Sequence, residues 1–207
     1  MGAGFLPTTI CNGQLYFLFG KENIYATTPG YADFGGGTDN NESFMETAIR
    51  EFTEETTGFF GNKTQLKEYV KKKGTFIINY EPKSKRYNTY RTYILPIQYN
   101  PYIVEFYNNN HSFLKEKLPK QLYRHAKYLE KSELRWFSLN DIKKNNTMFR
   151  SYYKDILKLI IQDSSQIKQF VQSSLSHSAS SISISNKKNK KHNITLKHNN
   201  RILNLTK

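Results

Sequence analysis

The chain has 207 residues, enough for one domain of ordinary size and an appendage. Its 31 Lys and Arg against 17 Asp and Glu give a formal net charge of +14, which favours polyanionic partners such as nucleic acid, nucleotides or inositol phosphates. A single cysteine, Cys11, excludes an intrachain disulfide framework, and no apolar run approaches the roughly 20 residues of a membrane helix. We expect a cytoplasmic protein with no signal peptide and no membrane contact. A genome-wide bias toward Asn, Lys, Tyr and Ile is an alternative source of the charge.

The N-terminal part predicts strands joined by a tight turn. A strand is expected from Phe5 to Cys11, with Pro7 favouring an edge position because proline cannot donate to a sheet ladder. Asn12-Gly13 is a hairpin signal, and the continuous apolar run Gln14–Phe19 predicts a strand buried on both faces. A short strand at residues 32–34 then leads into three glycines, where the backbone turns and can approach a ligand closely.

A capped helix is expected directly after the glycines. Ser43 and Glu46 have the spacing of a capping box. Apolar residues at helical spacing would dock this helix on the sheet: Phe44, Met45, Ala48, Ile49 and Phe52.

The opposite face of the same helix is acidic. Glu51 neighbours both Glu54 and Glu55, and like charges at this spacing cost roughly 0.2–0.5 kcal/mol per pair. Arg50 can pair with Glu54 but does not neutralise three carboxylates. Mg²⁺ takes oxygen ligands, typically one or two carboxylates with waters and substrate phosphates. The pattern therefore predicts a metal-holding loop and helix.

The segment from Gly36 to Glu55 also resembles the signature of the Nudix hydrolase family. That signature is Gly, five residues, Glu, seven residues, Arg-Glu, an apolar residue, any residue, Glu-Glu, any residue, Gly. Gly36, Glu42 and Arg50–Glu55 match it in register. The last glycine comes one residue late, at Gly58, and we interpret this as a longer last turn with Gly58 as the C-cap.

The resemblance implies a Nudix α/β/α sandwich with a mixed β-sheet, and hydrolysis of a diphosphate linkage with Mg²⁺ or Mn²⁺ as cofactor. Arg50 would orient a carboxylate, and Glu42 would hold the loop against the helix. The metal would be bound by three carboxylates and one backbone carbonyl: Glu51, Glu54, Glu55 and Gly36. The residues do not separate a metal ligand from the general base.

Basic side chains elsewhere are candidates for contact with substrate phosphates. Lys21 follows the second strand, and a solvated strand-end lysine is the alternative role. Two runs, 75–80 and 87–98, predict a hairpin that carries Arg86 and Arg91. A salt bridge at the sheet edge is the alternative for Arg91.

The middle of the chain is less informative. Residues 64–73 fit a strand or a short helix, and residues 101–121 favour a helix that consecutive asparagines weaken. Trp136 lies in a strand similar to the last strand of the family and is expected in the core. Glu130 or Glu133 is a candidate for the late-loop carboxylate that serves as general base in some family members.

The C-terminal part predicts a helix followed by a tail. An amphipathic helix is expected from Phe149 to Val171, with a polar break at residues 163–165. The composition then shifts to Ser, Lys and Asn, with no acidic residue after Asp163. We expect a Nudix domain at residues 1–172 and a disordered basic tail at 173–207, which either contacts nucleic acid or stays solvated.

Three functions are consistent with these residues. The chain resembles Nudix proteins of large DNA viruses, some of which remove mRNA caps, so decapping of capped RNA in a host cytoplasm or virion is favoured. A diphosphoinositol polyphosphate hydrolase, or a hydrolase of free nucleoside diphosphates linked to another group, is the enzymatic alternative. The third is a non-catalytic RNA- or nucleotide-binding protein on a Nudix scaffold, against which the intact Glu51, Glu54 and Glu55 argue.

Overall fold

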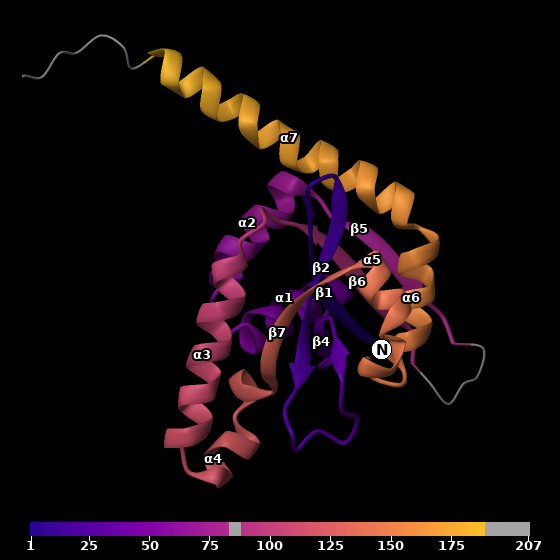
Figure 1. Cartoon of the computed structure of the whole chain (residues 1–207), viewed down its shortest axis with the longest axis vertical. Coiled ribbons are helices and arrows are strands. Elements are labelled where there is room, and N and C mark those ends of the chain that lie inside the picture. Colours follow the sequence, from indigo (N-terminus) through magenta and orange to yellow (C-terminus); the bar gives the residue numbers. More distant parts are fainter. Residues whose placement is uncertain (83–87, 189–207) are drawn as a thin grey trace, which may run out of the picture. The chain divides into compact units, whose positions relative to one another are not determined.

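The computed structural model describes residues 1–82 and 88–188, apart from the side chains of residues 177–188. Within these ranges a mixed sheet of 7 strands has the order β3-β2-β1-β6-β5, with β4 paired to β1 and β7 paired to β2 (Figure 1). Its pairs are antiparallel except β1 with β6, which is parallel. The strands are β1 (Gly2–Cys11), β2 (Gln14–Glu22), β3 (Tyr31–Ala32), β4 (Phe34–Gly37), β5 (Phe76–Tyr80), β6 (Tyr90–Pro96) and β7 (Lys131–Ser138).

Helices cover both faces of this sheet. The core on one face includes residues of α1, α2 and α3, and the core on the other includes residues of α5, α6 and the first turns of α7. The α/β/α sandwich with a mixed sheet is therefore confirmed. The helices are α1 (Phe44–Glu55), α2 (Lys63–Lys73), α3 (Pro101–Lys117), α4 (Lys120–His125), η1 (Lys127–Leu129), α5 (Leu139–Lys144), η2 (Asn146–Met148), α6 (Tyr153–Gln162) and α7 (Ser164–Lys188).

Strand β2 explains how the two cores form. Side chains alternate across a strand, so neighbours in the sequence enter opposite layers. Phe17 and Phe19 lie in the core beneath α6, whereas Leu18 lies in the core beneath α1, and all three are 0% exposed. The continuous apolar run thus forms a strand buried on both faces, as predicted.

The predicted edge position of Pro7 is wrong. Strand β1 is central, because β6 pairs with it on one side while β4 and β2 share the other. Along that shared side, β4 pairs with residues 2–5 and β2 pairs with residues 8–11. Pro7 falls between these two segments, where β1 changes partner, so its missing N–H interrupts neither of them.

Helix α1 begins as predicted and ends earlier. Ser43 caps it, and both hydrogen bonds of the capping box with Glu46 are present. The C-cap is Thr56 and not Gly58. The left-handed backbone after the helix begins at Thr57 (φ 50°) and continues through Gly58 (φ 75°), so the expected lengthening of the last turn to Gly58 is absent.

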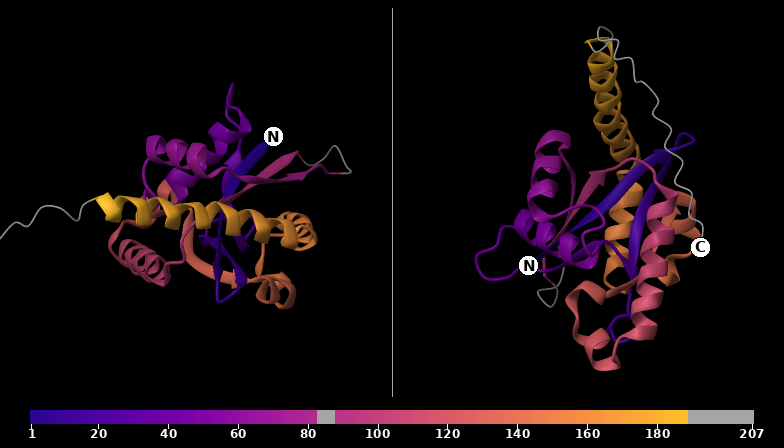
Figure 2. Two further views of the ribbon diagram at one scale, coloured as in Figure 1. Left: turned by 90° about the horizontal axis from the view of Figure 1, so that it is seen from above. Right: turned by 90° about the vertical axis from the view of Figure 1, so that its left-hand side faces the viewer.

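The two segments whose secondary structure the sequence did not decide are both helical. Residues 64–73 lie in α2, whose N-cap Asn62 forms a capping box with Gln65. Residues 101–121 form α3 and the start of α4, and Figure 2 shows α3 from two further sides as a long helix beside the sheet. The asparagines do not end α3, because the amide of Asn108 bonds both the N–H (2.7 Å) and the carbonyl (3.1 Å) of Leu134 in β7.

The C-terminal helix divides where a polar break was predicted. Helix α6 ends at Gln162, Asp163 is its C-cap, and α7 starts at Ser164. The boundary predicted at Ser173 lies inside α7, where Leu175 still packs on the core and Ser174 bonds Lys73. The chain divides into two compact units, Met1–Leu175 and Ser176–Lys207, and residues 189–207 lie outside the described residues.

The predicted hairpin is present as β5 and β6, paired antiparallel from Phe76–Ile94 to Tyr80–Tyr90. Arg86 lies outside the described residues. In the described part of the chain, none of the helices has the length and apolar character needed to span a membrane.

Candidate active site

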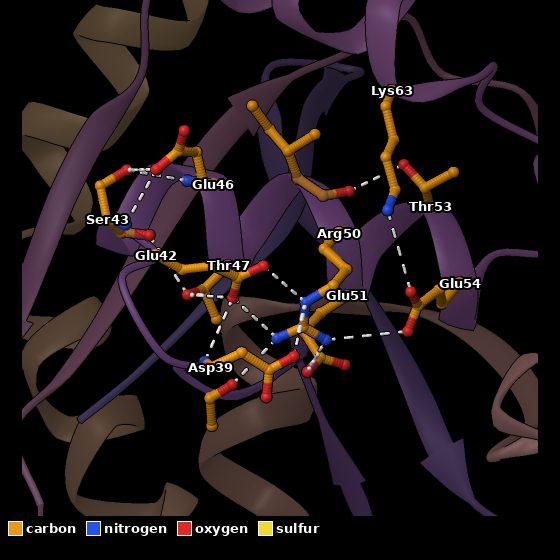
Figure 3. A network of polar contacts seen from close by, with 12 residues as sticks. Asp39, Glu42, Ser43, Glu46, Thr47, Arg50, Glu51, Thr53, Glu54 and Lys63 are labelled. Carbon is orange, nitrogen blue, oxygen red and sulfur yellow. Dashed lines mark hydrogen bonds and ion pairs between the residues drawn. The ribbon is translucent and has the colours of Figure 1, made fainter.

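Arg50 is the centre of the acidic cluster on α1 (Figure 3). Its side chain is 12% exposed and donates to both oxygens of Glu42, at 2.8 and 3.0 Å. It also donates to Glu51 Oε1 at 2.6 Å and to the carbonyl of Gly37 at 3.0 Å. The glycine strand, the loop and the helix are thereby tied together. These bonds from Arg50 lower the pKa of Glu42 to about 2, so its carboxylate is ionised.

Glu51 packs directly against the glycine strand. A Cβ on Gly36 would lie 2.5 Å from Glu51 Oε1, so any larger residue would push this carboxylate out of its present position beside the backbone. Burial raises the pKa of Glu51 above its usual value, and Arg50 opposes that effect. The structure thus brings Gly36, Glu42, Arg50 and Glu51 into one site.

Glu54 lies one turn further along the same face and is more open. Its carboxylate is 3.7 Å from Arg50 and 3.9 Å from Lys63 of α2, and its side chain is 28% exposed. Of the three glutamates predicted to bind metal, Glu54 is therefore the one best able to turn toward a ligand from solvent.

Glu55 belongs to a buried ionic network that extends to the far end of β2. It is 2% exposed and lies 3.1 Å from Nζ of Lys131, which is 0% exposed and also donates to Glu22. Arg150 contacts the same oxygen of Glu22 at 2.5 Å. Burial acts to lower the pKa of Lys131, but the carboxylates of Glu55 and Glu22 raise it, so the lysine stays charged.

Sequence reasoning missed Lys131, Glu22 and Arg150. The pairing of β2 with β7 sets Glu22 opposite Lys131, although they are 109 residues apart in the chain. A lysine at the start of an apolar strand was the available signal, but only the register of β2 on β7 identifies its partner.

The two late-loop carboxylates lie on different sides of the sheet. Glu130 follows η1, which contacts α1, and its pKa is raised by partial burial and by the charge of Glu51. Glu133 is bonded by Tyr31 at 2.6 Å and by Lys21 at 3.4 Å. Lys21 shares the face of Phe17 and Phe19, away from α1. The structure therefore places η1, which Glu130 follows, against α1 and leaves Lys21 and Glu133 on the other side of the sheet.

Oxygen ligands for a divalent cation are present but not converged. Among the described side chains, those of residues 1–82 and 88–176, no three His, Cys, Asp or Glu already form a metal-binding group. Arg50 and Lys131 hold the carboxylates instead. The set still fits a hard cation, because Glu51 and Glu54 are oxygen donors on one face, and Glu55 Oε2 is buried without a hydrogen-bond partner in the described part of the chain.

A pocket of about 630 Å³ adjoins the glycine strand on the side opposite Glu51. The backbone of Gly35–Gly37 forms one wall, and a Cβ on Gly35 would meet the hydroxyl of Tyr90 at 2.3 Å. Aromatic and charged side chains complete the lining: Tyr80, Tyr90, Arg150, Tyr152 and Asp155.

No protein-family model matches the chain. A segment of 61 residues is 43% identical to an uncharacterized protein of Acanthamoeba polyphaga mimivirus; the match covers 28% of this chain and only 20% of that protein. The chain is similar to a C. elegans Ap4A hydrolase in a binary complex, with 16% identity, a TM-score of 0.48, and coverage of 81% of this chain and 98% of that chain.

It is also similar to a Nudix hydrolase from M. smegmatis, RenU, with 14% identity, a TM-score of 0.46, and coverage of 81% and 87%. For the MutT protein from Methanosarcina mazei the identity is 16%, the TM-score 0.44, and the coverage 79% and 93%. Of these three proteins, the one from M. smegmatis is described as a Nudix hydrolase, which is the name of the family that the segment from Gly36 to Glu55 resembles.

Proposed function

We propose that this chain is a divalent-cation-dependent pyrophosphohydrolase of the Nudix type, which cleaves a diphosphate linkage. Arg50 carries the proposal. It donates to Glu42, to Glu51 and to the carbonyl of Gly37, so residues spread over the whole motif act at one place. A merely solvated acidic helix face would not require an arginine that is 12% exposed and bonded in three directions.

Mg²⁺ or Mn²⁺ would be held by Glu51 and Glu54, with Glu55 and the carbonyl of Gly36 as the further predicted ligands. Carboxylate and carbonyl oxygens are the donors these hard cations select. When bound, such a cation neutralises phosphate oxygens and lowers the pKa of a water molecule.

The chain's own residues supply positioning and proton transfer. Arg50 holds Glu42 and Glu51 in place before substrate arrives, which reduces the entropy lost on reaching the transition state. Glu130 follows η1, which contacts α1, and partial burial followed by the charge of Glu51 raises its pKa, so we propose its carboxylate as the group that accepts the proton of the attacking water. Lys63, 3.9 Å from Glu54, adds positive charge that would favour an anionic substrate near this face.

For the substrate we propose the 5′ cap of RNA. A methylated guanine is cationic and is held between aromatic faces with a carboxylate nearby. The pocket behind the glycine strand offers Tyr80, Tyr90 and Tyr152, with Asp155 at its wall. The net charge of +14 supports an RNA partner, and the basic run at residues 187–192 would contact its phosphates.

Hydrolysis is tested by substituting Glu54 in the presence of Mg²⁺. Glu54→Gln keeps the size of the side chain and removes its charge, so turnover of a diphosphate-linked substrate should fall by orders of magnitude. Glu68→Gln, on the exposed surface of α2, is the matched control and should keep wild-type turnover. Near-normal turnover of the Glu54 variant would show that Glu54 has no role in the reaction.

The substrate is tested by offering three classes side by side with Mg²⁺: cap-labelled RNA, free cap analogue and diphosphoinositol polyphosphates. Release of the cap from RNA supports decapping. Preference for diphosphoinositol polyphosphates or for the free cap analogue contradicts decapping and leaves the proposed hydrolase activity standing. No release from any substrate, with RNA bound, would favour a non-catalytic binding protein.

A further inference from the structure

A second pocket lies on the α1 face of the sheet, next to the Arg50 cluster. It encloses about 390 Å³ between β6 and the first turn of α1. Arg91 and Tyr93 enter it from β6, Phe44 from α1, and Thr38 and Glu42 from the loop that joins β4 to α1. Glu42 therefore lies both in the wall of this pocket and in the Arg50 cluster.

Two polar atoms in this pocket are buried without partners. Among the described residues, neither Arg91 Nε nor Thr38 Oγ1 has a hydrogen-bond partner, although both are inaccessible to water. The guanidinium of Arg91 stacks on the ring of Phe44, 4.3 Å from its centroid. Stacking fixes the plane of an arginine and leaves its N–H groups directed sideways, where they bind planar or tetrahedral anions. Buried donors normally have partners, so a missing acceptor is indicated here.

The sheet places this pocket at a defined distance from Glu51. Gly36 pairs with Ala3, and Ala3 pairs with Arg91, so the three residues form one row across β4, β1 and β6. Neighbouring strands are about 4.8 Å apart, which puts Arg91 about 10 Å from Gly36 along the row. Ala3 and Tyr93 belong to the core beneath α1, so Arg91 faces the same layer as the carboxylate of Glu51.

We infer that this pocket binds a phosphate group of the substrate that lies beyond the scissile linkage, and that Arg91 selects substrates carrying such a group. Thr38 supplies a second hydrogen bond. Arg50 bonds both oxygens of Glu42, which reduces the repulsion between this carboxylate and a bound anion. The first turn of α1 favours negative charge through its backbone dipole. This inference rests on the proposed function for the identity of the ligand, but its binding test does not.

The test is a calorimetric titration of the full chain with inorganic pyrophosphate in EDTA, where cation-dependent hydrolysis cannot occur. Arg91→Gln should weaken binding about tenfold or more, since a charge-assisted hydrogen bond is lost. Arg91→Lys keeps the charge but lacks Nε and should weaken binding less. Arg135→Gln is the matched control, because Arg135 also stacks on an aromatic ring, that of Phe137, but lies outside the pocket.

Equal binding by the wild type and Arg91→Gln, or no binding by the wild type in the millimolar range, overturns the inference. Thr38→Val is a second variant of the same pocket, which tests the inference even if the Arg91 variants misfold. It should weaken binding severalfold. With Mg²⁺ and a substrate that hydrolyses, Arg91→Gln should raise KM and change kcat little. Arg91-dependent binding without any hydrolysis would refute the proposed function alone, and hydrolysis with an unchanged KM would refute the inference alone.

Discussion

Lys131 is a buried charge that is stable only because its partners surround it. Its side chain is 0% exposed, its Nζ lies 3.1 Å from Glu55, and it donates to Glu22 as well. Lys131→Met keeps most of the apolar stem and removes the charge. Glu55, 2% exposed, is then left without its cation, whereas Glu22 keeps Arg150 at 2.5 Å.

Breaking a buried pair by removing one partner costs about 3–5 kcal/mol, mostly because a charge is left buried and uncompensated. We expect a loss of this size for Lys131→Met. Glu55→Gln should cost about 1 kcal/mol, because Lys131 retains Glu22. The double variant has no unpaired charge at position 55, so it should recover most of the loss, with a coupling energy of about 2 kcal/mol or more.

The assay is urea unfolding in EDTA, followed by the fluorescence of Trp136, the single tryptophan. Lys158→Met is the matched control: Lys158 also pairs with a carboxylate, Asp155 at 2.6 Å, but its side chain is 71% exposed, and no measurable loss is expected. A loss below about 1 kcal/mol for Lys131→Met, or strict additivity in the double variant, would refute the reasoning.

Two further predictions concern single residues. Thr57 holds a left-handed backbone (φ 50°) and buries a hydroxyl that lacks a partner within the described residues, so Thr57→Gly should stabilise the protein by about 1 kcal/mol; a lower urea midpoint would contradict this. Burial raises the pKa of Asp33 to about 6, so the free energy of unfolding falls as pH rises from about 4 to 6 and stays lower above it. Asp33→Asn can still bond to Tyr90 and Thr92 and should remove this fall, which amounts to about 3 kcal/mol between pH 4 and pH 8. If the free energies of unfolding of the variant and the wild type instead differ by the same amount at every pH, that result would falsify the assignment.

Features set by neighbouring residues could be predicted from the sequence. The start of α1 follows from Ser43 and Glu46, and its docked face follows from the spacing of Ala48 and Phe52. The burial of β2 on both faces follows from its unbroken apolar run. Each of these features depends only on contacts within one helix or strand, or on burial of its apolar face, whichever segment of the chain covers that face.

Features set by strand pairing could not be predicted. Pro7 is tolerated in a central strand because β4 and β2 pair with separate parts of β1 on the same side and leave Pro7 between them. Asp33 looked like a short strand residue, but Tyr90 and Thr92 of β6 reach it from 57 and 59 residues away. The orphaned Nε of Arg91 likewise depends on how β6 meets the first turn of α1.

The same limit applies to the three glutamates of the motif, which are equivalent by spacing and differ in their surroundings. Glu51 is held by Arg50 against Gly36, Glu54 is partly exposed, and Glu55 faces Lys131. A glutamate neutralised by a buried lysine contributes first to stability, and a cation must compete with that lysine to bind it. If the Lys131 and Glu55 substitutions couple as expected in EDTA, Glu55 is a structural partner in the absence of metal. Mg²⁺ that stabilises Lys131→Met more than wild type would then show that the same carboxylate also accepts the cation.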